Sequence, residues 1–504
     1  MNLLSVAVVF PMIAAIIISV ANKDWAKKIA LSAAIIELLI TLQVVRIFNH
    51  DDGGFQLVQF YTWIPSINCQ FLIGVDGISV IFLPMTALLI LLSIITSWHI
   101  PTTLIRLYWV LLLILEAAII GIFSALDLIL FFFFWELILL PIFFLMGLWG
   151  GIRRSGAAIK YILLMLFGNV PLLVAFTILA INHVSQINGN LPQDLSFSLP
   201  VLLETPLSEQ LQTIVFFLML VGFAIRVPLI PLHSSLLSSV ISMPATITSL
   251  LVGLNLGIYG IIRFVIPLAP SAAVENNWIL AIWGAITLIY AGLIMLQQTN
   301  LRRLLVFASI SHSGLVIMGI AALNMQGIQG ALFQLFNFTL AISALLLIAG
   351  FIQQRLGSTE QQHLGGLIIN MPRLTTFHFI FILTIAGIPG SSGFPAQLLV
   401  IMGALLGHPS LGLTALAGIL LNTANLLVYS RRTFLGPIKR TSVSQTQDLR
   451  PRELTVLSIL ALLIIVFGFW PNGFLTLNKK TAETWLARLL DQPTLEGEEL
   501  VQLN

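Results

Sequence analysis

The chain consists mainly of apolar stretches that are about as long as a lipid bilayer is thick. A helix rises about 1.5 Å per residue and therefore needs roughly twenty mainly apolar residues to cross the hydrocarbon core. On this basis we expect about fourteen transmembrane helices. They lie near residues 4–21, 28–47, 76–98, 108–126, 128–149, 157–182, 213–230, 244–264, 274–296, 303–323, 327–352, 373–402, 410–433 and 452–471. This pattern predicts an all-α, polytopic membrane protein.

Few side chains in this sequence suit a surface that faces water. Of the 504 residues, 58% are hydrophobic and only 9% are charged, whereas a soluble chain carries about 25% charged residues. The single cysteine, Cys69, excludes a disulfide framework and sites with several cysteine ligands. No P-loop or glycine-rich nucleotide-binding turn is present. We therefore expect no cofactor in this chain and no nucleic-acid partner, since the net charge of +3 comes from short loops.

The positive charges predict an orientation, because Lys and Arg favour cytoplasmic loops. The first, third, fifth, ninth, eleventh and thirteenth connections carry them, from Lys23 in the first to Arg452 in the last. The second and sixth connections carry acidic residues without Lys or Arg. This alternation supports the expected count and predicts that both termini lie on the non-cytoplasmic side. Arg263 falls on the unfavoured side.

The apolar stretches continue from end to end and predict one transmembrane domain over residues 1–471. Residues 4–21 lack a small-residue cleavage site, and we expect them to form a retained helix rather than a signal peptide. The tail at 472–504 has scattered apolar residues around Trp485 and is expected to lie along the membrane surface.

Two of the expected helices contain helix-breaking residues. They are Pro228 and Pro231 within 226–233, and Pro389, Gly390, Gly393 and Pro395 within 387–397. Proline removes a backbone donor and clashes with the preceding turn, so both helices should be broken. Broken backbone at membrane depth survives only where protein buries it or where it lines a hydrated cavity, and a pair of such breaks indicates an ion or substrate path. The alternative is a pair of kinks that serve packing alone. Their spacing suggests two five-helix repeats, at about 108–264 and 274–433.

Ionisable side chains inside the apolar stretches are functional candidates, because a charge in lipid costs several kcal/mol. Glu136 lies mid-span, where loss of water favours its neutral form and makes its protonation sensitive to a nearby cation. Arg226, just before the first pair of prolines, is the expected cationic partner. The alternatives are a carboxyl that only hydrogen-bonds a neighbouring helix and an arginine that snorkels to the interface.

Three further side chains are candidates for a proton path. Glu116 lies within a span and is placed to extend a path toward the carboxyl described above. His233, in the broken segment, and His312, in mid-span, are relay candidates because histidine changes its charge near neutral pH. For each histidine the alternative is a buried hydrogen-bonding role. Asp76 and Asp127 fall near helix starts, where capping accounts for a carboxylate.

Short motifs follow one another along nearly the whole chain. They are Gly74-Val-Asp76-Gly77-Ile-Ser79, Ala125-Leu-Asp127, Phe131-Phe-Phe-Phe-Trp135-Glu136-Leu137, Leu148-Trp149-Gly150, Pro228-Leu-Ile-Pro231-Leu-His233, Tyr259-Gly260-Ile-Ile-Arg263-Phe264, Ser311-His312-Ser-Gly314 and Gly387-Ile-Pro389-Gly390. In this order they resemble the M-type antiporter-like subunit of complex I, which is the subunit-4 chain of NADH–quinone oxidoreductases.

The resemblance implies fourteen helices with two inverted five-helix repeats and proton transfer coupled to quinone reduction elsewhere in the assembly. The implied partners are the lipid membrane and other membrane subunits of a complex I-type assembly, with quinone and redox cofactors bound by partner subunits. The implied membrane is the bacterial inner or thylakoid membrane, or that of an organelle. Any enzymatic activity would belong to the assembly, because this chain offers no redox centre of its own.

The chain departs from the family pattern at its relay positions. The resemblance implies glutamate at Glu136, which is kept. The resemblance also implies that the family has lysine at the positions of Arg226 and Asn255. It implies histidine at the positions of Phe338 and Val240, and glutamate at the position of Gln397. Independently of any alignment, no lysine occurs between Lys160 and Lys439.

The chemistry of these departures predicts that the lysine relay is absent. A buried lysine can release its proton in the working pH range, whereas arginine stays protonated. Asn255, Phe338 and Gln397 do not titrate. An Arg226–Glu136 pair would then act as a fixed electrostatic latch rather than a switch. A chain of water molecules is the alternative carrier of protons.

Three functions remain open at this point. The first is a proton-translocating membrane-arm subunit of a complex I-type NADH–quinone oxidoreductase, with NADH or another donor. The second is a non-pumping scaffold paralogue in a complex I-like assembly, linked to an accessory module such as one for inorganic carbon. The third is a subunit of a multisubunit cation/proton antiporter.

Overall fold

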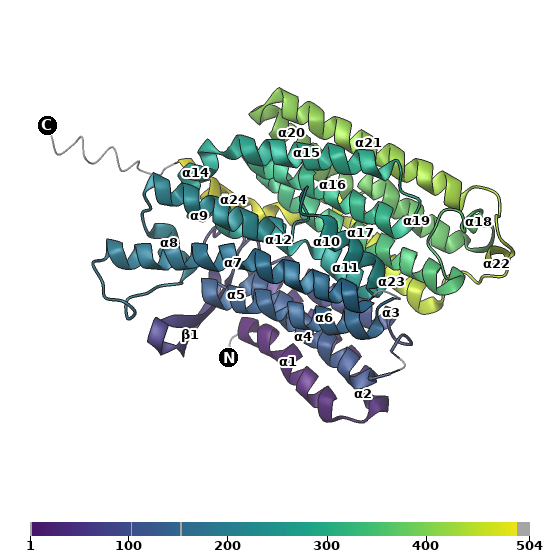
Figure 1. The fold of residues 1–504 in the computed structure, drawn as a ribbon, viewed down its shortest axis with the longest axis horizontal. Helices are drawn as coiled ribbons and strands as arrows, with labels where there is room; N and C mark the ends of the chain where they lie inside the picture. Colours follow the sequence, from purple (N-terminus) through teal and green to yellow (C-terminus); the bar gives the residue numbers. More distant parts are fainter. Residues whose placement is uncertain (1–2, 102, 152–153, 491–504) are drawn as a thin grey trace.

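A computed structural model describes residues 3–101, 103–151 and 154–490. Most helices run in roughly the same direction and form one bundle (Figure 1). The first half of the chain forms α1 (Leu3–Val20), α2 (Lys23–Ile47), β1 (Gln56–Ile64), η1 (Pro65–Ile67), β2 (Cys69–Val75), α3 (Phe82–Thr96), α4 (Ile105–Ser124), α5 (Leu128–Leu137), α6 (Leu139–Trp149), α7 (Arg154–Gln186), α8 (Leu199–Glu204), α9 (Glu209–Ala224), α10 (Ser234–Ser242), α11 (Ala245–Leu254), α12 (Leu256–Gly260), the π-helical turn η2 (Ile261–Val265), α13 (Ile266–Leu268) and α14 (Pro270–Glu275). The second half forms α15 (Asn277–Met295), α16 (Leu301–Ala321), α17 (Met325–Leu356), α18 (Leu367–Asn370), α19 (Pro372–Ile385), α20 (Gly393–Gly407), α21 (Pro409–Phe434), α22 (Thr441–Ser444), α23 (Pro451–Phe469) and α24 (Asn472–Leu490).

Each expected span corresponds to a helix or to a pair of helices separated by a break. In the described part of the chain, eleven spans are long and apolar enough to cross a membrane by length and composition. The prediction of a helical, multi-pass membrane fold is confirmed, whereas the count of about fourteen and the division into two inverted repeats stay predictions. The centre of the bundle is formed by α16 and α17, whose apolar windows are buried throughout. The outer helices α2, α7 and α23 leave leucine and isoleucine side chains exposed.

The connection between α2 and α3 contains a β-hairpin that the helical prediction did not include. Strands β1 and β2 are antiparallel, with Gln56 opposite Val75 and Tyr61 opposite Phe71. Strand β1 is mostly exposed, whereas most of β2 is buried. The hairpin therefore delivers the chain from a surface loop directly to Asp76, at the start of the next buried segment.

Both proline-containing helices are broken, as the sequence predicts. The first stops at Ala224 and resumes at Ser234, and the second stops at Ile385 and resumes at Gly393. The second break needs glycine, because Gly390 has φ +91° and a Cβ on Gly393 would lie 1.9 Å from the carbonyl oxygen of Thr384.

A third interruption, between α11 and α12, was not predicted. It occurs at Asn255, which has φ +39° and ψ +57°. Asparagine tolerates this left-handed conformation better than most residues, which allows a local break without proline. The π-helical turn η2 follows after one short helix. The segment from 245 to 268 is thus irregular over much of its length.

The tail forms helix α24 as far as Leu490, and the rest of the predicted tail, 491–504, lies outside the described residues. Helix α24 packs against α13, α14, α17 and α23. Trp485 is 6% exposed, and its indole N–H donates to the carbonyl oxygen of Ile262 at 3.0 Å. The interfacial position of the tail stays a prediction.

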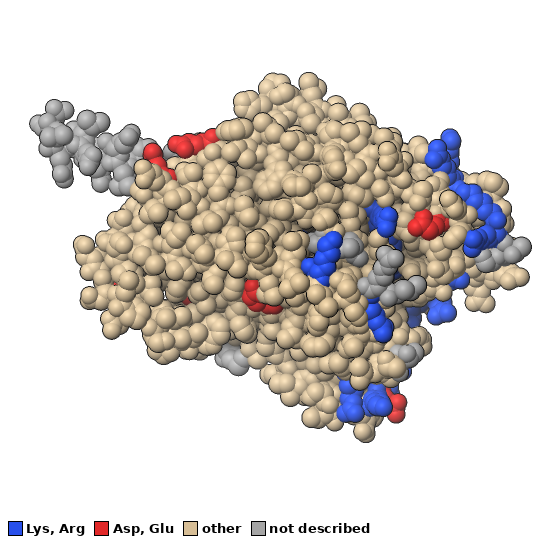
Figure 2. Space-filling model, viewed as in Figure 1, with Lys and Arg blue, Asp and Glu red and all other residues tan. Residues whose placement is uncertain are grey.

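Charged side chains are unevenly placed on the surface. On the face in Figure 2, the Lys and Arg side chains gather on the right-hand side of the molecule. Helix α24 lies toward the left in the same view (Figure 1). On this face, the right-hand half of the molecule is therefore richer in positive charge than the left-hand half.

Replacement of Gly393 by alanine tests the tight second break. We expect Gly393→Ala to lower the free energy of unfolding by about 1–3 kcal/mol, because the new methyl group overlaps the Thr384 carbonyl. Gly147→Ala in α6 is the matched control, since a Cβ there meets nothing within 4 Å. Denaturant titration in mixed micelles measures both variants, and equal effects would contradict the proposed overlap.

Candidate functional site

Glu136 and Arg226 are organised around a single tryptophan. Glu136 lies near the end of α5, where its Oε1 accepts a hydrogen bond from Asn169 Nδ2 at 2.5 Å. Asn169 is 3% exposed on α7, and its Oδ1 accepts from the indole N–H of Trp135 at 2.8 Å. The neighbouring tryptophan thus orients the amide that holds the carboxyl.

Arg226 approaches the same tryptophan from the first helix break. Its Nη2 donates to the carbonyl oxygen of Trp135 at 2.7 Å, and its Cζ lies 3.8 Å from the centroid of a Trp135 ring. A carbonyl and an aromatic face are both favourable partners for a guanidinium group. Its buried Nε has no hydrogen-bond partner in the described part of the chain.

The direct Arg226–Glu136 ion pair expected from the sequence is not formed among the described residues. Trp135 and Asn169 take the contacts that such a pair would need. The charges of Arg226 and Glu136 nevertheless act on each other. The arrangement is therefore a bridged pair, in which a neutral amide and an indole connect the carboxyl to the cation.

A second polar cluster surrounds the interruption at Asn255. The Nδ2 of Asn255 donates to Ser313 Oγ at 2.7 Å. The next residue back, His312, is 1% exposed, and its Nδ1 lies 2.9 Å from Gln334 Nε2. Phe338 stacks on the His312 ring with centroids 5.0 Å apart. The structure therefore brings His312 together with Asn255 and Phe338, two of the positions at which the sequence analysis expects a departure from the family pattern.

The second helix break contains a third group of neutral polar side chains. Gln397 is 4% exposed, and its Nε2 donates to the carbonyl oxygen of Ile385 at 2.7 Å. Ile385 ends α19, so Gln397 satisfies a carbonyl that the broken helix leaves without an intrahelical partner. Ser392 Oγ donates to Asn337 Oδ1 at 2.7 Å. An ionised glutamate at position 397 would lack the donor that this contact requires.

The other predicted residues lie apart from these groups. Glu116 on α4 is fully buried, and its carboxyl oxygens have no hydrogen-bond partner within the described ranges. The charge of Glu37, on the adjacent α2, acts on Glu116. His233 lies between the rings of Tyr290 and Phe307, with centroids 6.3 and 6.1 Å away. Val240 is 1% exposed on α10.

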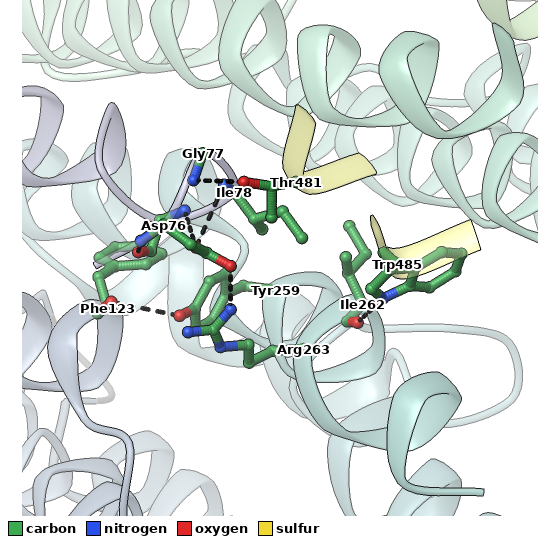
Figure 3. A network of polar contacts seen from close by, with 10 residues as sticks. Asp76, Gly77, Ile78, Phe123, Tyr259, Ile262, Arg263, Thr481 and Trp485 are labelled. Atoms are coloured by element: carbon green, nitrogen blue, oxygen red, sulfur yellow. Dashed lines mark hydrogen bonds and ion pairs between the residues drawn. The ribbon is translucent and has the colours of Figure 1, made fainter. Parts of the chain in front are cut away.

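Sequence reasoning missed two features of these sites. Asn169 is a polar amide in the middle of an expected span, and that position was a usable signal. Arg263 forms a buried ion pair with Asp76 (Figure 3), which explains a positive charge on the unfavoured side of the charge pattern. Asp127 caps α5 as predicted, accepting from the backbone N–H groups of Ile129 and Leu130.

A helical membrane bundle with two broken helices, one of them beside a bridged carboxyl–arginine pair, defines an antiporter-like membrane protein. The chain belongs to the family of transmembrane subunits described as NADH:quinone oxidoreductase/Mrp antiporter, whose model matches residues 125–422. It is accordingly an integral, multi-pass membrane protein.

Relatives match over nearly the full length. NADH-quinone oxidoreductase subunit M of Rhodobacter capsulatus is 32% identical over 485 residues, which cover 94% of each chain. NADH-ubiquinone oxidoreductase chain 4 of Arabidopsis thaliana is 31% identical over 450 residues, which cover 89% of each chain.

Solved structures agree on the fold. A chain of respiratory complex I from Thermus thermophilus with bound NADH has a TM-score of 0.87 at 26% identity, covering 96% of this chain and 99% of that one. A chain of the Mrp complex from Dietzia sp. has a TM-score of 0.82 at 21% identity, covering 98% and 99%. The second similarity extends to the fold alone.

A double-mutant cycle tests the connection between Trp135 and Asn169. We expect Trp135→Phe and Asn169→Leu to be coupled by about 1 kcal/mol in free energy of unfolding, because each removes one partner of the same hydrogen bond. Trp278 is 57% exposed, so Trp278→Phe should show no coupling with Asn169→Leu. Denaturant titrations of the single and double variants measure both cycles. Absence of coupling in the first pair would contradict the bridge.

Proposed function

We propose that this chain is a membrane-arm subunit of a complex I-type assembly that transfers electrons from NADH or another donor to a quinone. The observation that carries the proposal is the near full-length similarity to NADH-quinone oxidoreductase subunit M, which covers 94% of both chains. The partners would be other membrane subunits, and these or further subunits would bind the quinone and the redox cofactors. The enzymatic reaction would belong to the assembly.

We infer that Glu136 gains and loses a proton in this role. Its carboxyl is half-buried in an apolar helix, receives one hydrogen bond from Asn169, and experiences the charge of Arg226 without direct contact. Direct bidentate pairing would hold the carboxylate ionised. The bridged geometry weakens that hold and leaves the carboxyl responsive to a proton.

Beyond Glu136, the proposed path uses neutral groups and water instead of lysine. Several buried polar atoms have no hydrogen-bond partner within the described ranges. They are Asn255 Oδ1, His312 Nε2, Gln334 Oε1 and Asn337 Nδ2. Buried polar atoms of this kind are commonly paired with water. Among these four side chains only His312 is ionisable, so we propose that ordered water connects the interruption at Asn255 with the second helix break and that His312 is its one ionisable contact.

A second candidate function is a non-pumping scaffold in the same kind of assembly. The observation that favours it is the packing of Phe338 against His312, together with structural roles for Asn255 and Gln397 in helix breaks. On this reading the polar groups maintain the fold of a degenerate paralogue.

We also propose that both termini lie on the non-cytoplasmic side of a bacterial inner, thylakoid or organelle membrane. Support comes from the alternation of Lys and Arg among the connections between the expected spans. The two five-helix repeats, at about 108–264 and 274–433, remain part of this proposal.

Proton uptake per electron, measured in vesicles that carry the assembled complex, tests the role of Glu136. We expect Glu136→Gln to lower this ratio, because an amide cannot exchange a proton. Glu209→Gln, at the exposed start of α9, makes the same chemical change and should leave the ratio of protons to electrons unaltered.

We expect Arg226→Lys alone not to raise this ratio, since Asn255 and Gln397 still interrupt a chain of titratable groups. An unchanged ratio in Glu136→Gln would support the scaffold instead, whereas a clear increase in Arg226→Lys would contradict the neutral path.

Membership of the assembly is tested on a native gel of mildly solubilised membranes, with mass spectrometry of the proteins that migrate with this chain. Co-migration with quinone-reducing and iron–sulfur subunits is the expected result. Migration alone, or only with small antiporter-type subunits, would contradict it and favour ion exchange.

A further inference from the structure

An apolar cavity of about 270 Å³ lies among α2, α3, α17 and α23. Every side chain that lines it is apolar, and each of the four helices contributes at least one leucine: Leu42, Leu88, Leu340 and Leu463. Leu42 on α2 is 48% exposed, whereas Leu340 on α17 is 1% exposed. The cavity therefore reaches from the outer surface of the bundle to its buried centre, and an apolar group that enters it leaves no polar atom without a partner.

A second cavity, of about 570 Å³, lies at one end of three of these helices. It is lined where α3 ends, where α17 approaches its last turn and where α23 begins. Its polar lining consists of Thr96, His99, Gln354, Arg450, Arg452 and Glu453. This cavity is therefore the polar counterpart of the apolar one, and it is placed where the helices leave the apolar stretch of the chain.

The two cavities follow the same face of each helix. Their lining residues are separated by seven or fourteen positions, as in Leu88 and Ile95 on α3, Ile459 and Arg452 on α23, and Leu340 and Gln354 on α17. Seven residues make nearly two helical turns, so such residues point in almost the same direction, roughly 10 Å apart along the axis. Helix α23 packs against both α3 and α17. We call this shared face, with an apolar part and a polar end, the α3–α17–α23 seam.

The polar end of the seam carries positive charge that the protein does not balance. Its one carboxylate, Glu453, is 7% exposed and forms an ion pair with Arg355 of α17. Arg450 and Arg452 are exposed side chains, and neither forms an ion pair with any residue that the structure describes. The lining therefore has two arginines free to bind an anion, beside an exposed histidine, His99.

Trp98 gathers a further cation at this end. Arg452 Cζ and Lys27 Nζ, from the first turn or two of α23 and α2, lie 5.1 and 5.2 Å from the centroid of a Trp98 ring. The aromatic face attracts both cations, whereas the cations repel each other. A nearby anion relieves this repulsion. Tryptophan beside basic residues is also typical of the level at which lipid headgroups lie.

We propose that the α3–α17–α23 seam binds an anionic glycerophospholipid, with its phosphate at Arg450 and Arg452 and one acyl chain in the apolar cavity. An acyl chain spans about half of the 30 Å hydrocarbon core, roughly 15 Å, which is enough to reach from the polar end to Leu88 and Ile459. Basic pockets between transmembrane helices bind acidic headgroups in this way.

Charge favours a lipid over a transmembrane helix of a partner subunit. In a phospholipid the phosphate is covalently joined to the acyl chains, so charge and apolar group arrive together at the spacing that the seam offers. A helix would fill the apolar part but would need an acidic residue placed at its end to balance Arg450 and Arg452. The lipid site is separate from Glu136 and His312 and does not rest on the function proposed above.

Photo-cross-linking in nanodiscs that hold the full chain, with the subunits that copurify with it, tests the proposal. Phosphatidylglycerol and phosphatidylcholine that carry the same diazirine-labelled acyl chain are compared at equal content, and labelled peptides are identified by mass spectrometry. We expect phosphatidylglycerol to label peptides covering residues 81–88, 336–340 and 459–467 at least about threefold more than phosphatidylcholine does. Equal labelling by the two lipids would overturn the proposal. Absence of labelling there, with a protein cross-link in its place, would overturn it in favour of a partner helix.

A pair of arginine variants separates the seam from general surface charge. The double variant Arg450→Gln/Arg452→Gln should lower labelling by phosphatidylglycerol at least about fivefold and leave labelling by phosphatidylcholine unchanged. Arg303→Gln/Arg373→Gln is the matched control, because it removes the same charge at exposed residues that line neither cavity. Equal loss of labelling in the two double variants would overturn a site at the seam.

A bulky substitution tests the apolar part without a change in charge. Leu463→Trp fills the cavity and should lower labelling by both lipids at least about threefold in the peptides named above. Leu462→Trp is the control on the same helix, because Leu462 is 61% exposed and does not line the cavity. Undiminished labelling in Leu463→Trp would overturn the placement of an acyl chain there, even if the arginine variants failed to fold.

Discussion

Each interruption of a helix inside a membrane must find protein or water partners for its free backbone groups. Lipid offers none, and an unsatisfied peptide group costs several kcal/mol there. Gln397 meets this requirement at the second break by donating to Ile385. At the first break, the indole N–H of Trp283 donates to the carbonyl oxygen of Ile230 at 2.6 Å. The polar residues near the breaks therefore stabilise the fold, whether or not they also lie on a proton path.

A side chain that stabilises the fold can also transfer protons, and these two roles are difficult to separate for a single residue. Asn255 adopts a left-handed conformation that ends α11, and its side chain also bonds Ser313. A lysine at the same position would provide a titratable group but would adopt this backbone conformation less readily. Asparagine at this position thus favours a stable turn over a titratable side chain. The neutral path proposed above would be fixed in charge and would depend on water for any proton transfer.

Much of the fold could be predicted from the sequence, because apolar length and positive charge obey strong constraints in a bilayer. The two proline-containing breaks were predictable because proline removes a backbone donor and clashes with the preceding turn. The hairpin at Gln56–Val75 was not, since its strands are short and one of them is mostly exposed. The candidate site was predicted in part. Glu136 and Arg226 were identifiable as charges in apolar stretches, but Asn169 and Trp135, which separate them, depend on how α5 and α7 pack, and no local pattern encodes that packing.

The position of α24 has a consequence for the order in which the molecule is completed. Asp76 and Arg263 are 187 residues apart, and the final helix contacts the backbone on both sides of their pair, at Gly77 and at Ile262. During synthesis the hairpin and the π-helical turn leave the ribosome long before residue 472. If the ion pair forms before α24 is made, it lies in a partly open environment where water weakens its attraction, and it becomes enclosed only when α24 packs against it. The enclosure of this ion pair therefore depends on a segment that is synthesised well after both of its members.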